Sequence, residues 1–110
     1  MSDITYSINM KGKDIQESSV YTKWYNKLND RRAKAKIYVR VQRLGKGNPG
    51  DHRFLGDISE MKIDYGPGYR VYYKDTGKEV IILLCGGDKD TQQEDIKKAR
   101  DIWKTYEGGK

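Results

Sequence analysis

Hydrophobic and polar residues alternate along residues 60–73, EMKIDYGPGYRVYY, and this pattern predicts two strands joined by a tight turn. Proline fixes one backbone dihedral and glycine permits positive φ, so the turn alone explains residues 66–68. Alternation places Lys62, Arg70 and Tyr72 on the polar side of the hairpin. The sequence therefore predicts a sheet face on which a lysine, an arginine and a phenol gather.

Two segments before the hairpin have apolar residues at helical spacing. The first, residues 18–30, has Ser18 or Ser19 as a candidate N-cap. In the second, residues 31–44, most basic residues lie off the apolar stripe, which consists of Ala33, Ile37, Val41 and Leu44. A cluster of glycine and proline ends this helix. We therefore expect a helical hairpin that is broken near residues 29–30.

Three further segments predict strands. Residues 4–10 alternate and predict a first strand that runs to about Lys11, and residues 52–56 predict a short one. The VIILLC run at 80–85 is apolar on both faces, as in strands that are covered on both sides. We therefore expect residues 80–85 to be the middle of the sheet.

A closing helix is predicted after this strand. The TQQE sequence at 91–94 has the capping-box pattern, with Thr91 as N-cap and Glu94 reaching back. The apolar stripe that follows consists of Ile96, Ala99, Trp103 and Tyr106. The order of elements predicts an α+β fold, with an N-terminal helical hairpin and a C-terminal helix on a largely antiparallel sheet. In this prediction the helices cover one face of the sheet and leave part of the other for function.

The composition adds a strong positive charge to this picture. The 110 residues are 35% hydrophobic and 35% charged, enough for one modest core, so we expect a single domain over residues 1–110. The formal net charge is +6, and residues 31–46 contain seven Lys or Arg and no acidic residue. Such a stripe indicates a polyanionic or acidic protein partner, although a solvated helix face gives the same pattern.

Cysteine usage and apolar runs narrow the class of protein. The lone Cys85 excludes an internal disulfide, and its place at the end of an apolar strand is typical of a small buried side chain. No paired Cys/His spacing suggests zinc, and we expect neither a metal nor a cofactor. The first residues contain no apolar run typical of a signal peptide, and no stretch approaches the length of a membrane span. We expect a cytoplasmic protein.

Three motifs resemble a known family. They are GNPGD at 47–51, SEMKIDYGPGYRVYY at 59–73 and LLCGGDKDTQQEDIKKA at 83–99. Together they resemble the RelE/ParE superfamily of toxin proteins, and they are most similar to its HigB-like addiction module killer protein branch. The resemblance covers about residues 21–106 and implies a small RelE-like domain.

The resemblance also implies a function. Members of this superfamily are toxins of bacterial type II toxin–antitoxin systems, each neutralised by a cognate antitoxin protein. Some cut mRNA on the ribosome without a metal, which inhibits translation and arrests growth, whereas others poison DNA gyrase. Fold alone does not choose between these outcomes, and a non-catalytic RNA-binding or interaction module is a third alternative. We predict a ribosome-dependent mRNA interferase, an endoribonuclease that is monomeric without its antitoxin.

The chemistry of RNA cleavage selects candidate catalytic residues. Attack by a 2′-hydroxyl needs a base, cations around the phosphate and an acid for the leaving oxygen. The resemblance implies that Arg70 stabilises the phosphate. Weaker candidates are Lys62, Lys89, His52 and Tyr72. Each also has a structural alternative: Lys62 as a surface lysine, Lys89 as a loop charge, His52 as an incidental loop histidine and Tyr72 in cross-strand packing.

Other basic residues are candidates for binding the RNA chain. They are Arg40, Arg43, Lys46, Arg53 and Lys74. The chain departs from the family pattern after the last strand, where several nucleases of the superfamily place a catalytic tyrosine or histidine. Here residues 86–95 read GGDKDTQQED and contain neither. The departure puts efficient catalysis in question.

Overall fold

The computed structural model describes residues 12–108, which form five strands, three α-helices and one 3-10 turn. In chain order these are β1 (Asp14–Glu17), α2 (Ser19–Lys27), α3 (Arg31–Gly45), β2 (His52–Phe54), β3 (Ser59–Ile63), β4 (Tyr69–Asp75), β5 (Val80–Gly87), η1 (Lys89–Thr91) and α4 (Gln92–Gly108). The strand predicted at residues 4–11 lies outside the described range. Among the helices of residues 12–108, none is long and apolar enough to cross a membrane.

The five strands form one sheet in the order β1-β5-β4-β3-β2. Every pairing is antiparallel except that of β1 with β5, which is parallel. The predicted α+β class with a largely antiparallel sheet is therefore confirmed. β5 is buried on both faces, as predicted. It is not the middle strand, because β2 and β3 both lie beyond β4 and only β1 lies beyond β5.

The sequence did not predict β1. Its four residues read DIQE, and three of them are exposed. Ile15 alone packs against the core. A strand with one apolar residue has no alternation to detect, and β1 forms because the edge of β5 offers it a ladder of backbone hydrogen bonds.

One layer of the core lies between the sheet and helices α2 and α3. The predicted apolar stripe of α3 is buried as expected. Opposite it, the sheet contributes side chains that include Met61, Val71 and Leu83. The break between the helices also falls where it was predicted, since the side chain of Asp30 caps α3 by accepting from the N–H groups of Arg32 and Ala33.

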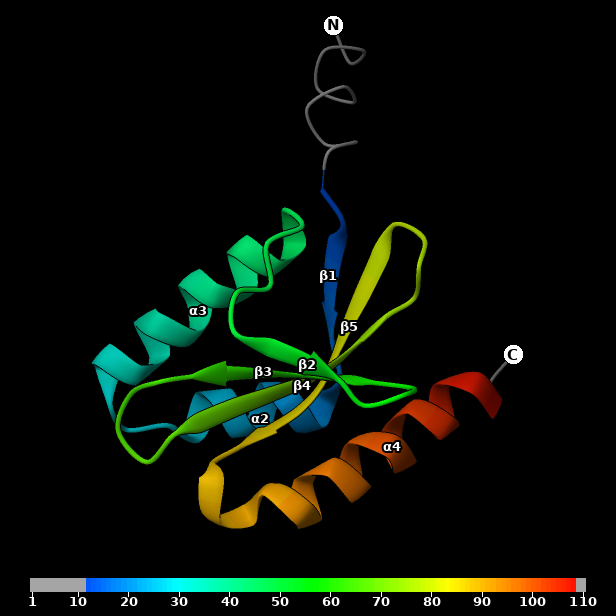
Figure 1. The fold of residues 1–110 in the computed structure, drawn as a ribbon. Helices are drawn as coiled ribbons and strands as arrows, with labels where there is room; N and C mark the ends of the chain where they lie inside the picture. The colour runs from blue at the N-terminus through cyan, green and yellow to red at the C-terminus, as the bar shows by residue number, and fades with distance from the viewer. Residues whose placement is uncertain (1–11, 109–110) are drawn as a thin grey trace, which may run out of the picture.

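A second layer lies on the opposite face of the sheet, against α4. Ile82, Leu84 and Cys85 of β5 pack there with Ala99 of α4. Figure 1 shows β3 and β4 running between α3 and α4. The prediction that the helices cover only one face is therefore wrong. Because β5 is apolar on both sides, its second face also needs a cover, and the C-terminal helix provides it.

The β3–β4 hairpin has the predicted register, but most of its polar face is covered. Lys62 lies opposite Arg70, and Glu60 lies opposite Tyr72, so these four side chains share a face. Only Lys62 is exposed, whereas the other three are buried. The cover comes from the start of α4, where Gln92 donates a hydrogen bond to Glu60.

The start of α4 differs from the predicted capping box. Asp88 caps the η1 turn, its side chain accepting from the N–H groups of Asp90 and Thr91. Thr91 completes a capping box with Asp88 instead of Glu94, because the 3-10 turn precedes the helix. At the other end, Tyr106 is among the exposed large side chains and not part of the buried stripe.

Candidate functional site

Three cations meet at the turn end of the β3–β4 hairpin. The strand register sets Lys62, Arg70 and Gly87 side by side on three neighbouring strands. Lys89 follows two residues after Gly87 and joins the same cleft. This cation cleft has a volume of about 370 Å³ and is lined by Asp51, Lys62, Ile63, Asp64, Gly68, Tyr69, Arg70 and Lys89. The structure thus brings together three of the five candidate catalytic residues.

The turn before β4 fixes the guanidinium of Arg70. Gly68 has a φ of 81°, a conformation that glycine adopts readily. Its carbonyl oxygen accepts a hydrogen bond from Arg70 Nη1 at 2.7 Å. A Cβ at Gly68 would lie 3.3 Å from that nitrogen and 3.5 Å from Cβ of Lys89. The glycine therefore makes the turn, as predicted, and also keeps the cleft between the two cations open.

A buried carboxylate lies behind the cleft. Glu60 is 0% exposed and accepts three hydrogen bonds. Arg53 Nε donates to Oε1 at 2.7 Å, while the Tyr72 hydroxyl and Gln92 Nε2 donate to Oε2 at 2.9 and 2.7 Å. These donors come from β2, β4 and α4, so Glu60 ties three elements together.

Arg70 completes this buried cluster as its fourth partner. Its Nε lies 3.7 Å from Glu60 Oε2, within ion-pair range, and has no hydrogen-bond partner. The residue is only 8% exposed although it lines the cleft. A planar guanidinium held from behind in this way presents its remaining donors to the cleft, and its fork matches phosphate oxygens.

The hydrogen bonds determine which groups of the cluster are ionised. Burial alone would raise the pKa of Glu60, but the hydrogen bonds from Arg53, Gln92 and Tyr72 outweigh it and lower the pKa below its ordinary value. Burial, and then the bond to the Glu60 carboxylate, raise the pKa of Tyr72 far above that of a free phenol. Near neutral pH the cluster thus holds a carboxylate and a neutral phenol.

Tyr72 has the packing role that was its alternative in the sequence. It is 0% exposed, belongs to the core layer under α4 and uses its hydroxyl as a donor to Glu60. In this position its ring is not accessible for stacking with a nucleobase, and its hydroxyl proton is donated to the carboxylate of Glu60. Tyr72 supports the cleft from within the core.

The structure does not bring His52 to Arg70. His52 pairs with Met61 across β2 and β3, so it lies on the sheet face opposite to that of Arg70. Its Nδ1 lies 2.8 Å from the carbonyl oxygen of Gly50. A proton transfer in the cation cleft has no direct route to this ring.

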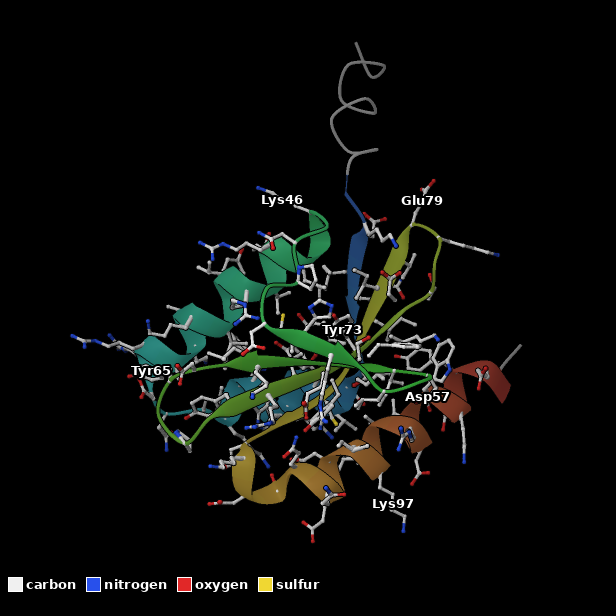
Figure 2. The ribbon with its side chains drawn as sticks, in the orientation of Figure 1. Lys46, Asp57, Tyr65, Tyr73, Glu79 and Lys97 are labelled. Carbon is white, nitrogen blue, oxygen red and sulfur yellow. The ribbon has the colours of Figure 1, made fainter. Side chains whose placement is uncertain are left out.

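The five candidate RNA-binding residues fall into two groups. Three of them have partners within the chain. Arg40 donates to the carbonyl oxygens of Lys62, Pro49 and Asp51, and Arg53 pairs with the carboxylate of Glu60. Lys74 donates to the carbonyl oxygen of Asp57 and lies over the ring of Trp103. Arg43 of α3 and Lys46, the C-cap of that helix, are exposed. Figure 2 shows Lys46 at the opposite end of α3 from Tyr65, so this basic row leads away from the cleft.

Sequence reasoning missed four polar residues of the site. Glu60 and Gln92 hold the cluster, and the carboxylates of Asp51 and Asp64 line the cleft beside its cations. Glu60 carried a signal, because the hairpin register places it opposite Tyr72 on the predicted polar face. Asp64 carried a signal too, because alternation places it on the same side of the hairpin as Lys62. Gln92 and Asp51 had none, since their positions depend on how distant segments fold together.

The cleft offers the means to bind and to act on a phosphate ester. Its three cations can neutralise phosphate oxygens, and its two carboxylates can accept a proton. Within residues 12–108, no group of three or more His, Cys, Asp or Glu side chains could hold a metal ion.

The architecture can be compared with that of solved structures. The chain resembles a double arginine-to-alanine mutant of the E. coli toxin RelE, determined in the free state, with a TM-score of 0.60 and 18% sequence identity. The match covers 78% of this chain and 96% of that chain. The fold is therefore RelE-like, as the sequence motifs implied.

A closer sequence relative is known from Haemophilus influenzae. It is named "Uncharacterized protein" and is 49% identical over 87 residues, which are 78% of this chain and 88% of that protein. The chain belongs to the same family as this H. influenzae protein. No family model matches the sequence.

Proposed function

We propose that the chain is the toxin of a type II toxin–antitoxin system, in the HigB-like branch of the RelE/ParE superfamily, and that it cleaves mRNA on the ribosome. The observation that carries the proposal is the cation cleft, in which Arg70, Lys62 and Lys89 meet on a RelE-like fold. The similarity to the E. coli toxin RelE and the net charge of +6 support the same function.

In the proposed reaction, a 2′-oxygen forms a bond to the adjacent phosphorus, and the bond from phosphorus to the next 5′-oxygen breaks. The products are a 2′,3′-cyclic phosphate and a free 5′-hydroxyl. Negative charge grows on the non-bridging oxygens in the transition state. Arg70 stabilises this charge, and because Gly68 and Glu60 already hold its guanidinium, little reorganisation is needed.

Two proton transfers accompany this exchange of bonds. The 2′-hydroxyl gives up a proton, and the leaving 5′-oxygen receives one. Asp51 and Asp64 are the carboxylates in the cleft that can accept the first. Lys62 and Lys89 are the ammonium groups there that can donate the second. His52 has no part in this scheme because it lies on the opposite face of the sheet, and Tyr72 has none because it is buried.

The partners of the protein follow from the same proposal. The ribosome orients mRNA in the cleft, so the purified protein can bind free RNA and still leave it intact. The cognate antitoxin is an acidic protein segment that folds as it binds to the basic surface. Both partners act in the cytoplasm, and the toxin without its antitoxin is a monomer.

Induction of the gene by itself tests the toxin function. Growth should stop, and coexpression of the neighbouring small gene should restore it. Primer extension on transcripts isolated after induction should reveal discrete breaks at fixed positions within codons. Continued growth at high expression would refute the toxin function.

The same experiment separates the alternatives. Growth arrest with intact transcripts and a DNA damage response would indicate a gyrase poison in place of a nuclease. RNA binding without arrest, breaks or DNA damage would indicate a non-catalytic module. The alanine variant of Lys89 is informative beside the wild type, because an exposed lysine can be removed without disturbing the core.

A further inference from the structure

Strand β2 presents an unusual set of side chains at the edge of the sheet. All three of its residues, His52, Arg53 and Phe54, are exposed. Phe54 is 68% exposed, the highest value among the exposed large hydrophobic residues of the described chain. Exposed aromatic rings are the side chains on which bases of single-stranded nucleic acid stack, whereas Arg53 lies on the other face and donates to Glu60.

His52 and Phe54 flank a pocket on the face opposite to the cation cleft. The pocket has a volume of about 460 Å³, and both rings line it together with Tyr73. Phe54, Ser59 and Tyr73 occupy one row across β2, β3 and β4. Tyr73 is at the inner end of this row, because β4 is the middle strand, and Figure 2 shows it near the middle of the sheet. The pocket is therefore a recess with aromatic walls at the sheet edge.

The polar groups of this pocket suit the edge of a nucleobase. Ser59, Lys13 and Asp75 line it, as does Asp57, whose two carboxylate oxygens already accept from Arg100 Nε. Lys13 Nζ and Asp75 Oδ1 form an ion pair at 2.7 Å, which leaves the second carboxylate oxygen and the lysine hydrogens for other partners. Donors and acceptors of this kind match the amino and carbonyl groups of a base, whereas an apolar peptide would leave them unpaired.

The imidazole of His52 is held before any ligand arrives. His52 Nδ1 contacts the carbonyl oxygen of Gly50, which fixes the imidazole against the loop before β2. Arg40 Nη2 in turn donates to the carbonyl oxygens of Pro49 and Asp51, at 2.9 and 3.1 Å, and fixes that loop to α3. Because this imidazole and its loop are already ordered, a ligand loses little entropy in ordering them.

The pocket and the cation cleft lie on opposite faces of the sheet, and Asp51 and His52 connect them along the chain at the edge strand. Asp51 lines the cleft, its carbonyl oxygen accepts from the backbone N–H of Lys62, and it directly precedes His52. At about 3.3 Å per strand residue, Phe54 lies roughly 10 Å along the edge from Asp51. A strand of RNA with one phosphate in the cleft can therefore pass round the edge strand β2 and place a base at the pocket.

We propose that Phe54 and His52 form a stacking site for an unpaired base of RNA, at the edge of the sheet and on the face opposite to the cation cleft. The proposal rests on the proposed function only in that the ligand is RNA. It assigns recognition of the base to β2 and contact with the phosphate to Lys62, Arg70 and Lys89. The stacking site thus holds the RNA strand whose phosphate lies in the cation cleft.

Fluorescence anisotropy with the purified protein and two labelled probes tests this site. One probe is a short unstructured RNA, and the other is an abasic ribose-phosphate chain of the same length. Phe54→Ala should weaken binding of the RNA on the order of 5- to 100-fold and leave binding of the abasic chain unchanged. Phe54→Trp should restore binding of the RNA, because indole also stacks.

Matched variants define the controls. Tyr38→Ala removes another exposed aromatic ring, from α3, and should change neither affinity. Lys62→Ala and Lys89→Ala should weaken binding of both probes by the same factor, since phosphate contacts do not depend on the base. A wild-type protein that binds neither probe, or binds both equally, would overturn the stacking site. So would a Phe54→Ala variant whose RNA binding is unchanged.

Other outcomes separate this proposal from the proposed function. Base-dependent binding together with intact transcripts after induction would overturn the nuclease and support the stacking site. Transcript breaks without base-dependent binding would support the nuclease and overturn the stacking site. If Phe54→Ala bound RNA normally but no longer copurified with the protein encoded beside it, the surface would belong to a protein partner and the proposal would be wrong.

Discussion

Glu60 and Arg70 are buried charges whose removal has unequal consequences. Without Arg70, Glu60 still accepts hydrogen bonds from three other side chains. Without Glu60, the guanidinium of Arg70 keeps only the carbonyl oxygen of Gly68 as a hydrogen-bond partner in the described chain. An uncompensated buried charge costs about 3–5 kcal/mol, so Glu60 is the more important of the two for stability.

Arg70→Lys tests the role of the guanidinium. The ammonium group keeps a positive charge near Glu60 but loses the planar fork that can contact the turn and a phosphate together. We expect growth arrest to be lost while the circular dichroism spectrum stays the same. Arg100→Lys is the matched control, because Arg100 also pairs with a carboxylate, that of Asp57, but lies outside the cleft. Full arrest by a folded Arg70→Lys variant would remove Arg70 from the mechanism.

Glu60→Gln tests the buried carboxylate through its pH dependence. The pKa of Glu60 is lowered in the folded protein, so its contribution to stability is present above the unfolded pKa of about 4.3 and is lost as the pH falls through the folded pKa. We expect the variant to be less stable than the wild type at pH 7, and the difference to shrink as the pH falls below about 4. Urea unfolding at a series of pH values measures both. A difference that does not change with pH would mean that the charge of Glu60 is unimportant.

At the scale of elements, the fold follows from strands whose two faces are both covered. β4 sends Val71 and Tyr73 to the layer under α2 and α3, and Tyr72 to the layer under α4. A bulge between β4 and β5 at Tyr72 and Tyr73 gives β5 one extra residue, so Leu84 and Cys85 both face α4. The cleft lies where this sheet ends and α4 begins.

Val71→Asp tests the register of the hairpin. Val71 is 0% exposed, and an unpaired carboxylate in its place should unfold the protein. Val39→Asp makes the same change on the exposed side of α3 and should alter stability by about 0.5 kcal/mol or less. Thermal unfolding followed by circular dichroism compares them. A folded Val71→Asp protein would mean that the faces of β4 are exchanged.

Much of this arrangement could be predicted from the sequence where hydrophobic residues recur at the period of a helix or a strand. The spacing of Ile37 and Val41 gave the buried face of α3, and alternation gave the register that sets Lys62 opposite Arg70. The cover over Arg70 was not predictable, because no local pattern says which face of a sheet a following helix will choose. Glu60 was overlooked for the same reason, since a charged residue at a polar position of a hairpin is ordinarily solvated.

At the scale of the whole molecule, the two faces of the sheet differ in what they present. One has the cation cleft at its turn end, and the other has the pocket with Phe54 at its edge. The net charge of +6 favours a polyanion on either. The fold class and the resemblance to toxins came from the sequence, whereas the neighbourhood of Lys89 and Asp51 could come only from the folded chain.

Light scattering on the free protein tests its oligomeric state. We expect the mass of one chain, 12.8 kDa. The exposed large apolar residues of the described chain are scattered over α2, α3, β2 and α4, and like charge opposes association. A mass twice as large at low concentration would show that the free protein pairs with itself and would contradict the proposed monomer.

Because Cys85 is buried, its reactivity with a thiol reagent can reveal when α4 separates from β5. Burial raises the pKa of this thiol to about 12, its Sγ donates to the carbonyl oxygen of Asp95, and the chain has no second cysteine. In the closed state a thiol reagent should therefore react very slowly at neutral pH. Reaction begins when α4 separates from β5, so the labelling rate under native conditions measures how often that happens. An antitoxin or an RNA that holds α4 in place should slow the labelling, and one that displaces it should speed it up.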